Sequence, residues 1–249
     1  MNSYDLKNKI SIITGGAGLL GIQHAHALLE INSTVILIDI DYKKLIKTKN
    51  YFKKLNKNVF VYQLDITNEN QLKKISSKIL KKFKKIDVLI NNAAVDYKPT
   101  KKIKKKVSFE SSDLTSWRKE IDVGLTGAYI SCKIFGNEIS KKGGVILNIS
   151  SDLSTIAPDQ RLYSHLNTVK PATYSVVKHG LIGLTKYLAA YWAKKKVRVN
   201  AISPGGVYNS QDKIFLKKIK KLIPMGRMAE PNEYREAIKF LCTDASKYM

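Results

Sequence analysis

Six short runs of apolar, mostly β-branched residues alternate with longer segments of helical period along this chain. Strands buried on both faces have such nearly continuous apolar sequences, and helices that cover a sheet have apolar residues every three or four positions. We expect strands at Ile10–Thr14, Thr34–Asp39, Val59–Tyr62, Asp87–Ile90, Val145–Ser150 and Val197–Ser203. We expect helices at Leu19–Ile31, Tyr42–Leu55, Glu69–Phe83, Leu114–Ser140 and Tyr174–Lys195. Repeated strand–helix units predict an α/β fold with one Rossmann-type, doubly wound parallel sheet and helices on both faces.

The length of 249 residues is typical of a single domain of this architecture, and no internal repeat interrupts the alternation. We therefore expect one domain over residues 1–249. The one low-complexity patch is KKIKKK at 101–106, within a polar connection from about Val95 to Asp113. This connection is predicted to be a surface loop or a lid.

The lengths of the apolar runs and the positions of the two cysteines indicate the cellular compartment of the protein. No stretch approaches 18 uncharged apolar residues, and residues 1–9 are polar without the apolar centre of a signal peptide. Cys132 and Cys242 lie far apart with no CxxC spacing, which argues against a disulfide framework and against a structural metal site. We expect a cytoplasmic protein without a membrane span or a bound metal.

The formal net charge of +24 raises the question of nucleic-acid binding, because basic surfaces attract phosphate backbones. Only five of the 44 basic residues are Arg, and Lys is spread over nearly every expected helix. Nucleic-acid sites more typically use Arg forks interleaved with aromatic residues. The sequence therefore predicts a small-molecule substrate rather than a nucleic-acid partner.

A glycine cluster follows the first expected strand and opens the first expected helix. Gly15, Gly18 and Gly21 have a spacing that lets the backbone turn tightly, approach a pyrophosphate and pack the helix against the sheet. The free N–H groups of a helix N-terminus favour phosphate binding. Ordinary turns also contain such clusters, so the prediction of a dinucleotide site depends on further features.

Asp39 is the most informative of these features. It ends the second expected strand, eighteen residues after Gly21, where a carboxylate can accept hydrogen bonds from the adenosine ribose. A carboxylate there would repel a 2′-phosphate, and the next residue is Ile40 rather than Arg. The sequence therefore predicts NAD rather than NADP as the cofactor. Lys43 and Lys44 are the main argument for NADP. Asp41 competes for the same role, but it lies beyond the apolar run and is expected to begin the next helix.

With these motifs the whole chain resembles the short-chain dehydrogenase/reductase family. The resemblance implies an enzyme that moves a hydride between a nicotinamide and a hydroxyl or ketone group. It also implies a set of cofactor-binding residues in the glycine turn, after the third and fourth strands and after the sixth strand. These are Thr14, Gly15, Gly18, Leu20, Gly21, Asp65, Ile66, Asn92, Ala93, Pro204, Gly205 and Val207, together with Tyr174 and Lys178.

By the same resemblance Ser151, Tyr174 and Lys178 are the catalytic residues. Tyr174 and Lys178 are four residues apart on one expected helix, so they share a face. A phenol has an ordinary pKa of about 10, and a nearby ammonium favours its ionised form. Tyr174 would then exchange a proton with the substrate oxygen, Ser151 would hold that oxygen, and Lys178 would also hold the nicotinamide ribose. Tyr163 is the alternative tyrosine, but Asn167 lies four residues after it.

Three positions depart from the family pattern. Asn209 stands where the family usually has the Thr of its PGxxxT segment and keeps the capacity for hydrogen bonding. Leu19 stands where the family has its middle glycine, so the phosphate turn is expected to differ in detail. Gly124 stands where the family usually has an Asn that forms part of the proton relay. The family role of that Asn depends partly on a main-chain carbonyl at a helix kink, which a glycine permits.

The chain has about ten more residues between Ser151 and Tyr174 than the family usually has, and this insert resembles the flagellin modification protein A type of dehydrogenase from bacterial surface-sugar pathways. A sugar or sugar phosphate is therefore the expected substrate. Arg161, His165 and Lys170 lie in the insert and are the candidate ligands for a phosphate or carboxylate on it. A solvated surface loop is the alternative interpretation of the same residues.

Three functions remain open from the sequence. The leading one is an NAD-linked dehydrogenase that works as a homodimer or homotetramer, and the others are a nucleotide-sugar epimerase or dehydratase and a cofactor-binding protein without turnover. The segment from Pro224 onward resembles the family's approach to a last strand of TGxxxxVDGG form, which this sequence does not contain. We therefore expect a sheet without that last strand, in which Val197–Ser203 lies at an edge.

Overall fold

The computed structural model describes residues 3–95 and 107–249. Most of the connection predicted to be a loop or lid, residues 96–106, lies outside the described residues. The six strands are β1 (Ile10–Thr14), β2 (Thr34–Asp39), β3 (Val59–Gln63), β4 (Val88–Asn91), β5 (Gly144–Ile149) and β6 (Val197–Ile202). Each begins and ends within one residue of its expected position.

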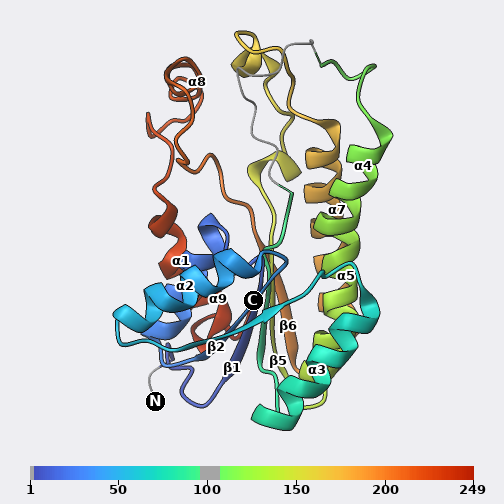
Figure 1. The fold of residues 1–249 in the computed structure, drawn as a ribbon, viewed down its shortest axis with the longest axis vertical. Helices are drawn as coiled ribbons and strands as arrows, with labels where there is room; N and C mark the ends of the chain where they lie inside the picture. The colour runs from blue at the N-terminus through green and yellow to red at the C-terminus, as the bar shows by residue number, and fades with distance from the viewer. Residues whose placement is uncertain (1–2, 96–106) are drawn as a thin grey trace.

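One parallel sheet contains all six strands, in the order β3-β2-β1-β4-β5-β6 (Figure 1). The chain leaves β1 in one direction to build β2 and β3, and returns to the other side of β1 to build β4, β5 and β6. The strand order therefore reverses between β1 and β4. Ligands of doubly wound sheets bind beside such a reversal, at the carboxyl ends of the strands.

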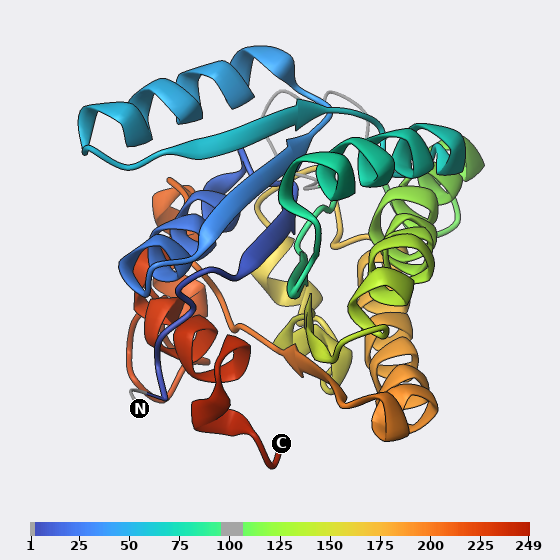
Figure 2. The ribbon, with the colours of Figure 1, turned by 90° about the horizontal axis from the view of Figure 1, so that it is seen from below.

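Helices cover both faces of the sheet (Figure 2). The helices are α1 (Leu19–Glu30), α2 (Tyr42–Lys54), α3 (Glu69–Phe83), α4 (Leu114–Ile121), α5 (Gly127–Ser131), α6 (Asn137–Ile139), α7 (Ala172–Trp192), α8 (Lys213–Ile219) and α9 (Arg235–Cys242). One apolar core joins the sheet to α1, α2 and α9, and a second joins it to α3, α6 and α7. The expected α/β architecture is confirmed.

The helical segment between β4 and β5 is continuous but irregular. Two π-helical turns, Asp122–Thr126 and Cys132–Gly136, separate α4, α5 and α6. Gly124 is buried in the first of these turns, and a Cβ atom there would lie 2.6 Å from Cγ1 of Val177 on α7. A π-helical turn thus lies where the resemblance implied a kink, and Val177 of α7 occupies the space that a side chain at position 124 would need.

β6 is an edge strand of the sheet, as expected. The turn after α9 (Asp244–Ser246) lies beside it, since the guanidinium of Arg198 donates hydrogen bonds to Ser246 Oγ at 2.9 Å and to the carbonyl oxygen of Thr243 at 2.8 Å. Within residues 3–95 and 107–249, no helix is long and apolar enough to cross a membrane.

Candidate active site

The predicted catalytic residues come from the end of β5 and the first two turns of α7. Ser150 and Ser151 follow β5 directly, and Ser150 Oγ donates a hydrogen bond of 2.9 Å to the backbone carbonyl of Lys178. Lys178 is buried, and its ammonium donates to the carbonyl oxygen of Ile149 at 2.8 Å. These two bonds fix the lysine against the strand end that carries Ser151.

Tyr174 lies one turn before Lys178, and the structure brings the two side chains together as the spacing predicts. The ammonium nitrogen of Lys178 is 5.6 Å from the centre of the Tyr174 ring. A second ammonium, that of Lys170, lies 3.6 Å from the same ring centre. Two ammonium groups therefore lie beside one aromatic ring, within the range of cation–π attraction.

Ser151 has an acidic neighbour that the sequence interpretation did not consider. Its hydroxyl donates a hydrogen bond of 2.8 Å to Asp152 Oδ1 and accepts a longer one, 3.3 Å, from the amide of Leu153. The amide of Asp152 donates to the carbonyl oxygen of Pro204 at 3.0 Å, which brings the segment after β6 against the end of β5. Pro204 and Gly205, both predicted cofactor residues, thus lie beside Ser151.

The glycine turn forms a cradle that side chains would fill. Gly15 has a φ of +61°, and a Cβ atom on it would lie 2.7 Å from Cα of Ala93. A Cβ atom on Gly21 would overlap the carbonyl oxygen of Gly15 and lie 2.8 Å from Cα of Gly16. This close approach of backbones leaves the amide groups at the start of α1 open to a phosphate.

The end of β4 closes the cradle. Thr14 Oγ1 accepts hydrogen bonds from the amides of Asn92 and Ala93 at 3.1 and 3.3 Å. The side-chain amide of Asn92 donates to the carbonyl oxygen of Gly15 at 2.9 Å. The predicted residues of the first and fourth strands are therefore one hydrogen-bonded unit at the reversal of strand order.

Asp39 lies against the same turn. Its Oδ2 accepts a hydrogen bond of 3.1 Å from the amide of Ala17. Asp41, the alternative carboxylate, caps α2 by accepting from the amide of Lys44 at 3.0 Å, and its Oδ2 also lies 3.3 Å from the ammonium of Lys44. Asp41 thus begins a helix as expected, and one of the two lysines that favoured NADP is paired with it.

A cavity of about 350 Å³ opens beyond Asp39, at the carboxyl ends of β2 and β3. Asp65 lines it and accepts hydrogen bonds from both the amide and the hydroxyl of Thr67 at 2.9 and 2.8 Å. The remaining lining residues are Ile40, Gln63, Leu64 and Gln71. Of these, Gln63 and Gln71 were not predicted to belong to the site. Their only signal in the sequence was their closeness to Asp65 along the chain. The cradle, Asp39 and this cavity are chemically suited to the phosphates, ribose and base of a dinucleotide, in that order.

Residues 17–249 match the family model described as enoyl-(acyl carrier protein) reductase. The chain belongs to the short-chain dehydrogenase/reductase family. It is 30% identical to an NAD-dependent glycerol dehydrogenase of Listeria innocua, over 98% of this chain and 90% of that protein. It is 27% identical to the post-translational flagellin modification protein A of Campylobacter coli, over 98% and 94%. Among solved structures it resembles gox2181, with a TM-score of 0.89, 25% identity and coverage of 99% and 93%.

Membership makes the protein an NAD- or NADP-dependent oxidoreductase, and the resemblance to flagellin modification protein A is confirmed at the level of sequence. In this short-chain dehydrogenase/reductase two buried titratable groups near the end of β4, His24 and Cys132, are neutral at pH 7. Burial lowers the pKa of His24 to about 4, and burial raises the pKa of the Cys132 thiol to about 12. Cys132 accepts a hydrogen bond of 3.1 Å from the side chain of Asn91.

The three candidate substrate residues of the insert have different surroundings in this dehydrogenase. Arg161 is bound to Asp159 at 2.8 Å and its side chain is 86% exposed. His165 Nε2 lies 2.9 Å from Asp212 Oδ1, at the N-terminus of α8. Of the three, Lys170 is the one that the structure places on the Tyr174 ring.

Proposed function

We propose that this protein is an NAD-dependent dehydrogenase that interconverts a hydroxyl and a ketone on a polyol, sugar or sugar phosphate used in flagellin or surface-glycan modification. The observation that carries the proposal is that Lys178 lies beside the Tyr174 ring and is hydrogen-bonded to the end of β5, which leads directly into Ser151. A proton-exchanging phenol then lies next to a site suited to a dinucleotide.

The three residues have separate roles in this proposal. When bound, the nicotinamide supplies the hydride acceptor or donor. Tyr174 takes the proton from the substrate hydroxyl during oxidation and returns it during reduction. Ser151 holds the substrate oxygen, and Asp152 orients the Ser151 hydroxyl through their 2.8 Å hydrogen bond. Lys178 stabilises the phenolate and holds the nicotinamide ribose.

The substrate class is supported by the groups around Tyr174 and by the relatives. Lys170 adds a cation that suits a phosphate or carboxylate, and Asp152 adds an acceptor for further hydroxyl groups. One relative is named for glycerol and another for flagellin modification. A polyhydroxylated substrate agrees with Asp152 and with the names of these relatives, and the Lys170 ammonium suits one that also carries an anionic group.

A panel of polyols, sugars and sugar phosphates tests the proposal, with formation of reduced cofactor followed at 340 nm. A dehydrogenase accumulates reduced cofactor, an epimerase recycles it, and a protein without turnover shows only saturable cofactor binding. Mass spectrometry of metabolites that co-purify with the protein would narrow the panel. Absence of reduced cofactor with every member, despite cofactor binding, would contradict the proposed dehydrogenase.

Cofactor choice gives a specific expectation. The unmodified protein should have a higher kcat/KM with NAD than with NADP, because the Asp39 carboxylate lies against the glycine turn and repels a 2′-phosphate. Asp39→Ala should narrow that gap. Asp41→Ser is the matched control, since it removes a nearby carboxylate but keeps a residue that caps α2. Equal kcat/KM for the two cofactors in the unmodified protein would contradict the assignment.

Lys170→Gln should raise KM for an anionic substrate by about tenfold or more, because a hydrogen bond to a charged group contributes roughly 1.5–3 kcal/mol. Arg161→Gln should have a smaller effect, since that guanidinium is exposed and already paired with Asp159. Lys186→Gln, on the exposed face of α7, controls for loss of one positive charge. An unchanged KM in Lys170→Gln would assign the insert to a solvated surface loop instead.

We also propose that the protein forms a homodimer or homotetramer. Tyr129 on α5 and the stacked pair Tyr187 and Tyr191 on α7 are more than half exposed. Exposed aromatic residues of this kind are typical of protein interfaces. Size-exclusion chromatography with light scattering would show whether the protein is a dimer or tetramer.

A further inference from the structure

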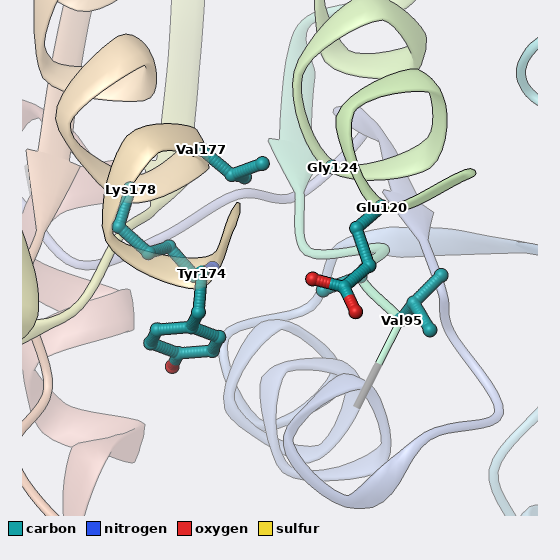
Figure 3. A pocket seen from close by; sticks show the side chains of 7 residues that line it. Val95, Glu120, Gly124, Tyr174, Val177 and Lys178 are labelled. Carbon is teal, nitrogen blue, oxygen red and sulfur yellow. The ribbon is translucent and has the colours of Figure 1, made fainter. Parts of the chain in front are cut away.

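A small cavity separates α4 from α7 beside the predicted catalytic tyrosine. It is lined by Ala94, Val95, Glu120, Gly124, Tyr174, Val177 and Lys178, and its volume is about 10 Å³. That volume corresponds to about one water molecule, which needs two to four polar partners to be held in place. Figure 3 shows the Glu120 carboxylate extending from α4 into the space beside Tyr174. We propose that Glu120, acting through one water in this cavity, carries protons between the Tyr174–Lys178 pair and solvent.

The inference rests on the proposed function, because a dehydrogenase must exchange one proton with solvent in each turnover. Gly124 has no side chain to take part in that exchange, and Val177 occupies the space where one would lie. Glu120 lies four residues before Gly124 on the same helical segment, so both face α7. The carboxylate thus reaches the cavity from one helical turn away.

The charges that line the cavity suit a relay. Lys178 and Glu120 have opposite charges and lie on opposite walls, from α7 and α4. The Lys178 ammonium donates to the carbonyl oxygen of Ile149, and Lys178 also lines the cavity. Glu120 lines the cavity and is partly exposed, so it lies between the cavity and solvent.

Each proton transfer balances without a further reactant. During alcohol oxidation the substrate O–H bond breaks as the Tyr174 phenolate gains its proton. The cavity water then accepts a proton from the Tyr174–Lys178 pair as it gives one of its own to the Glu120 carboxylate. Glu120 releases that proton to bulk water and returns to its ionised form, and reduction runs through the same steps in reverse.

The test compares Glu120→Gln and Glu120→Ala with Asp122→Asn, which removes an exposed carboxylate two residues away on the same segment. We expect kcat to fall at least about tenfold in both Glu120 variants, less than the 10²–10⁴-fold typical of a general acid or base that acts directly on the substrate. KM and NADH affinity, the latter measured by fluorescence, should be unchanged. The solvent isotope effect on kcat should increase, because proton transfer becomes slower than the other steps. Formate should restore turnover of Glu120→Ala in a saturable way.

Two results would overturn the relay. Unchanged kcat and solvent isotope effect in Glu120→Gln would show that protons leave by another route. A raised KM with unchanged kcat, and no response to formate, would make Glu120 a substrate ligand instead. Failure of the proposed function is separate, since the unmodified protein would then fail to accumulate reduced cofactor on any substrate.

Discussion

Tyr174→Phe should lower kcat by at least about 10²-fold, the usual effect of removing a general acid or base. The substitution removes only the phenol oxygen. The phenyl ring would still pack against the Lys170 ammonium, which lies 3.6 Å from the ring centre. The first turn of α7 should therefore keep its structure. NADH affinity, measured by fluorescence titration, should therefore change little, and the loss should be confined to turnover.

Tyr163→Phe is the matched control for this substitution. Tyr163 lies in the insert that precedes Tyr174. It is buried, and its ring centre is 5.6 Å from that of Phe215 on α8. Asn167, not a lysine, lies four residues after Tyr163. Near-normal turnover in Tyr174→Phe, or a loss in Tyr163→Phe as large as that in Tyr174→Phe, would contradict the assignment.

Gly21→Ala should weaken NADH binding by at least about tenfold and lower the free energy of unfolding by roughly 1–3 kcal/mol. The added methyl group would overlap the carbonyl oxygen of Gly15 and lie 2.8 Å from Cα of Gly16. Both contacts are with backbone atoms, so no side chain can rotate away and the turn itself must open. Thermal melts and fluorescence titration at one protein concentration measure the two effects.

Gly183→Ala provides the control, because it makes the same change within α7 where, apart from the adjacent residues and the helix's own backbone, the added Cβ meets no heavy atom of the described residues within 4 Å. It should stabilise the protein by about 0.5–1 kcal/mol, since alanine favours the helix interior. NADH affinity should be unchanged. If Gly21→Ala behaved like Gly183→Ala, the glycine turn would not be the close-packed cradle described above.

The strands and the cofactor turn could be predicted from the sequence because their signals are local. Apolar runs predicted each strand to within one residue. Asp41 lies just beyond such a run, and this position predicted that it begins a helix, as it does at α2. The helix kink at Gly124 was implied only by the resemblance. The close fit of Gly124 against the Val177 side chain of α7 joins residues 53 positions apart, which no local pattern encodes.

Contacts between distant segments could not be predicted. Arg161, His165 and Lys170 were grouped because they are close in sequence, yet His165 lies against Asp212, 47 residues away, while Lys170 lies on the Tyr174 ring. Glu120 was missed although it lies four residues before Gly124, a spacing that places the two on one helical face. Only the packing of α4 on α7 shows that this face lines the cavity.

The fit between Gly124 and Val177 also limits how this protein could change over evolution. Substitution of Gly124 by a larger residue creates a steric clash with the Val177 side chain. Substitution of Val177 by a smaller residue creates only a cavity, which costs less stability. Lineages that regain a side chain at 124 should therefore have shortened position 177 first. In an alignment of relatives, bulky residues at both positions should be rare, and the two positions should covary.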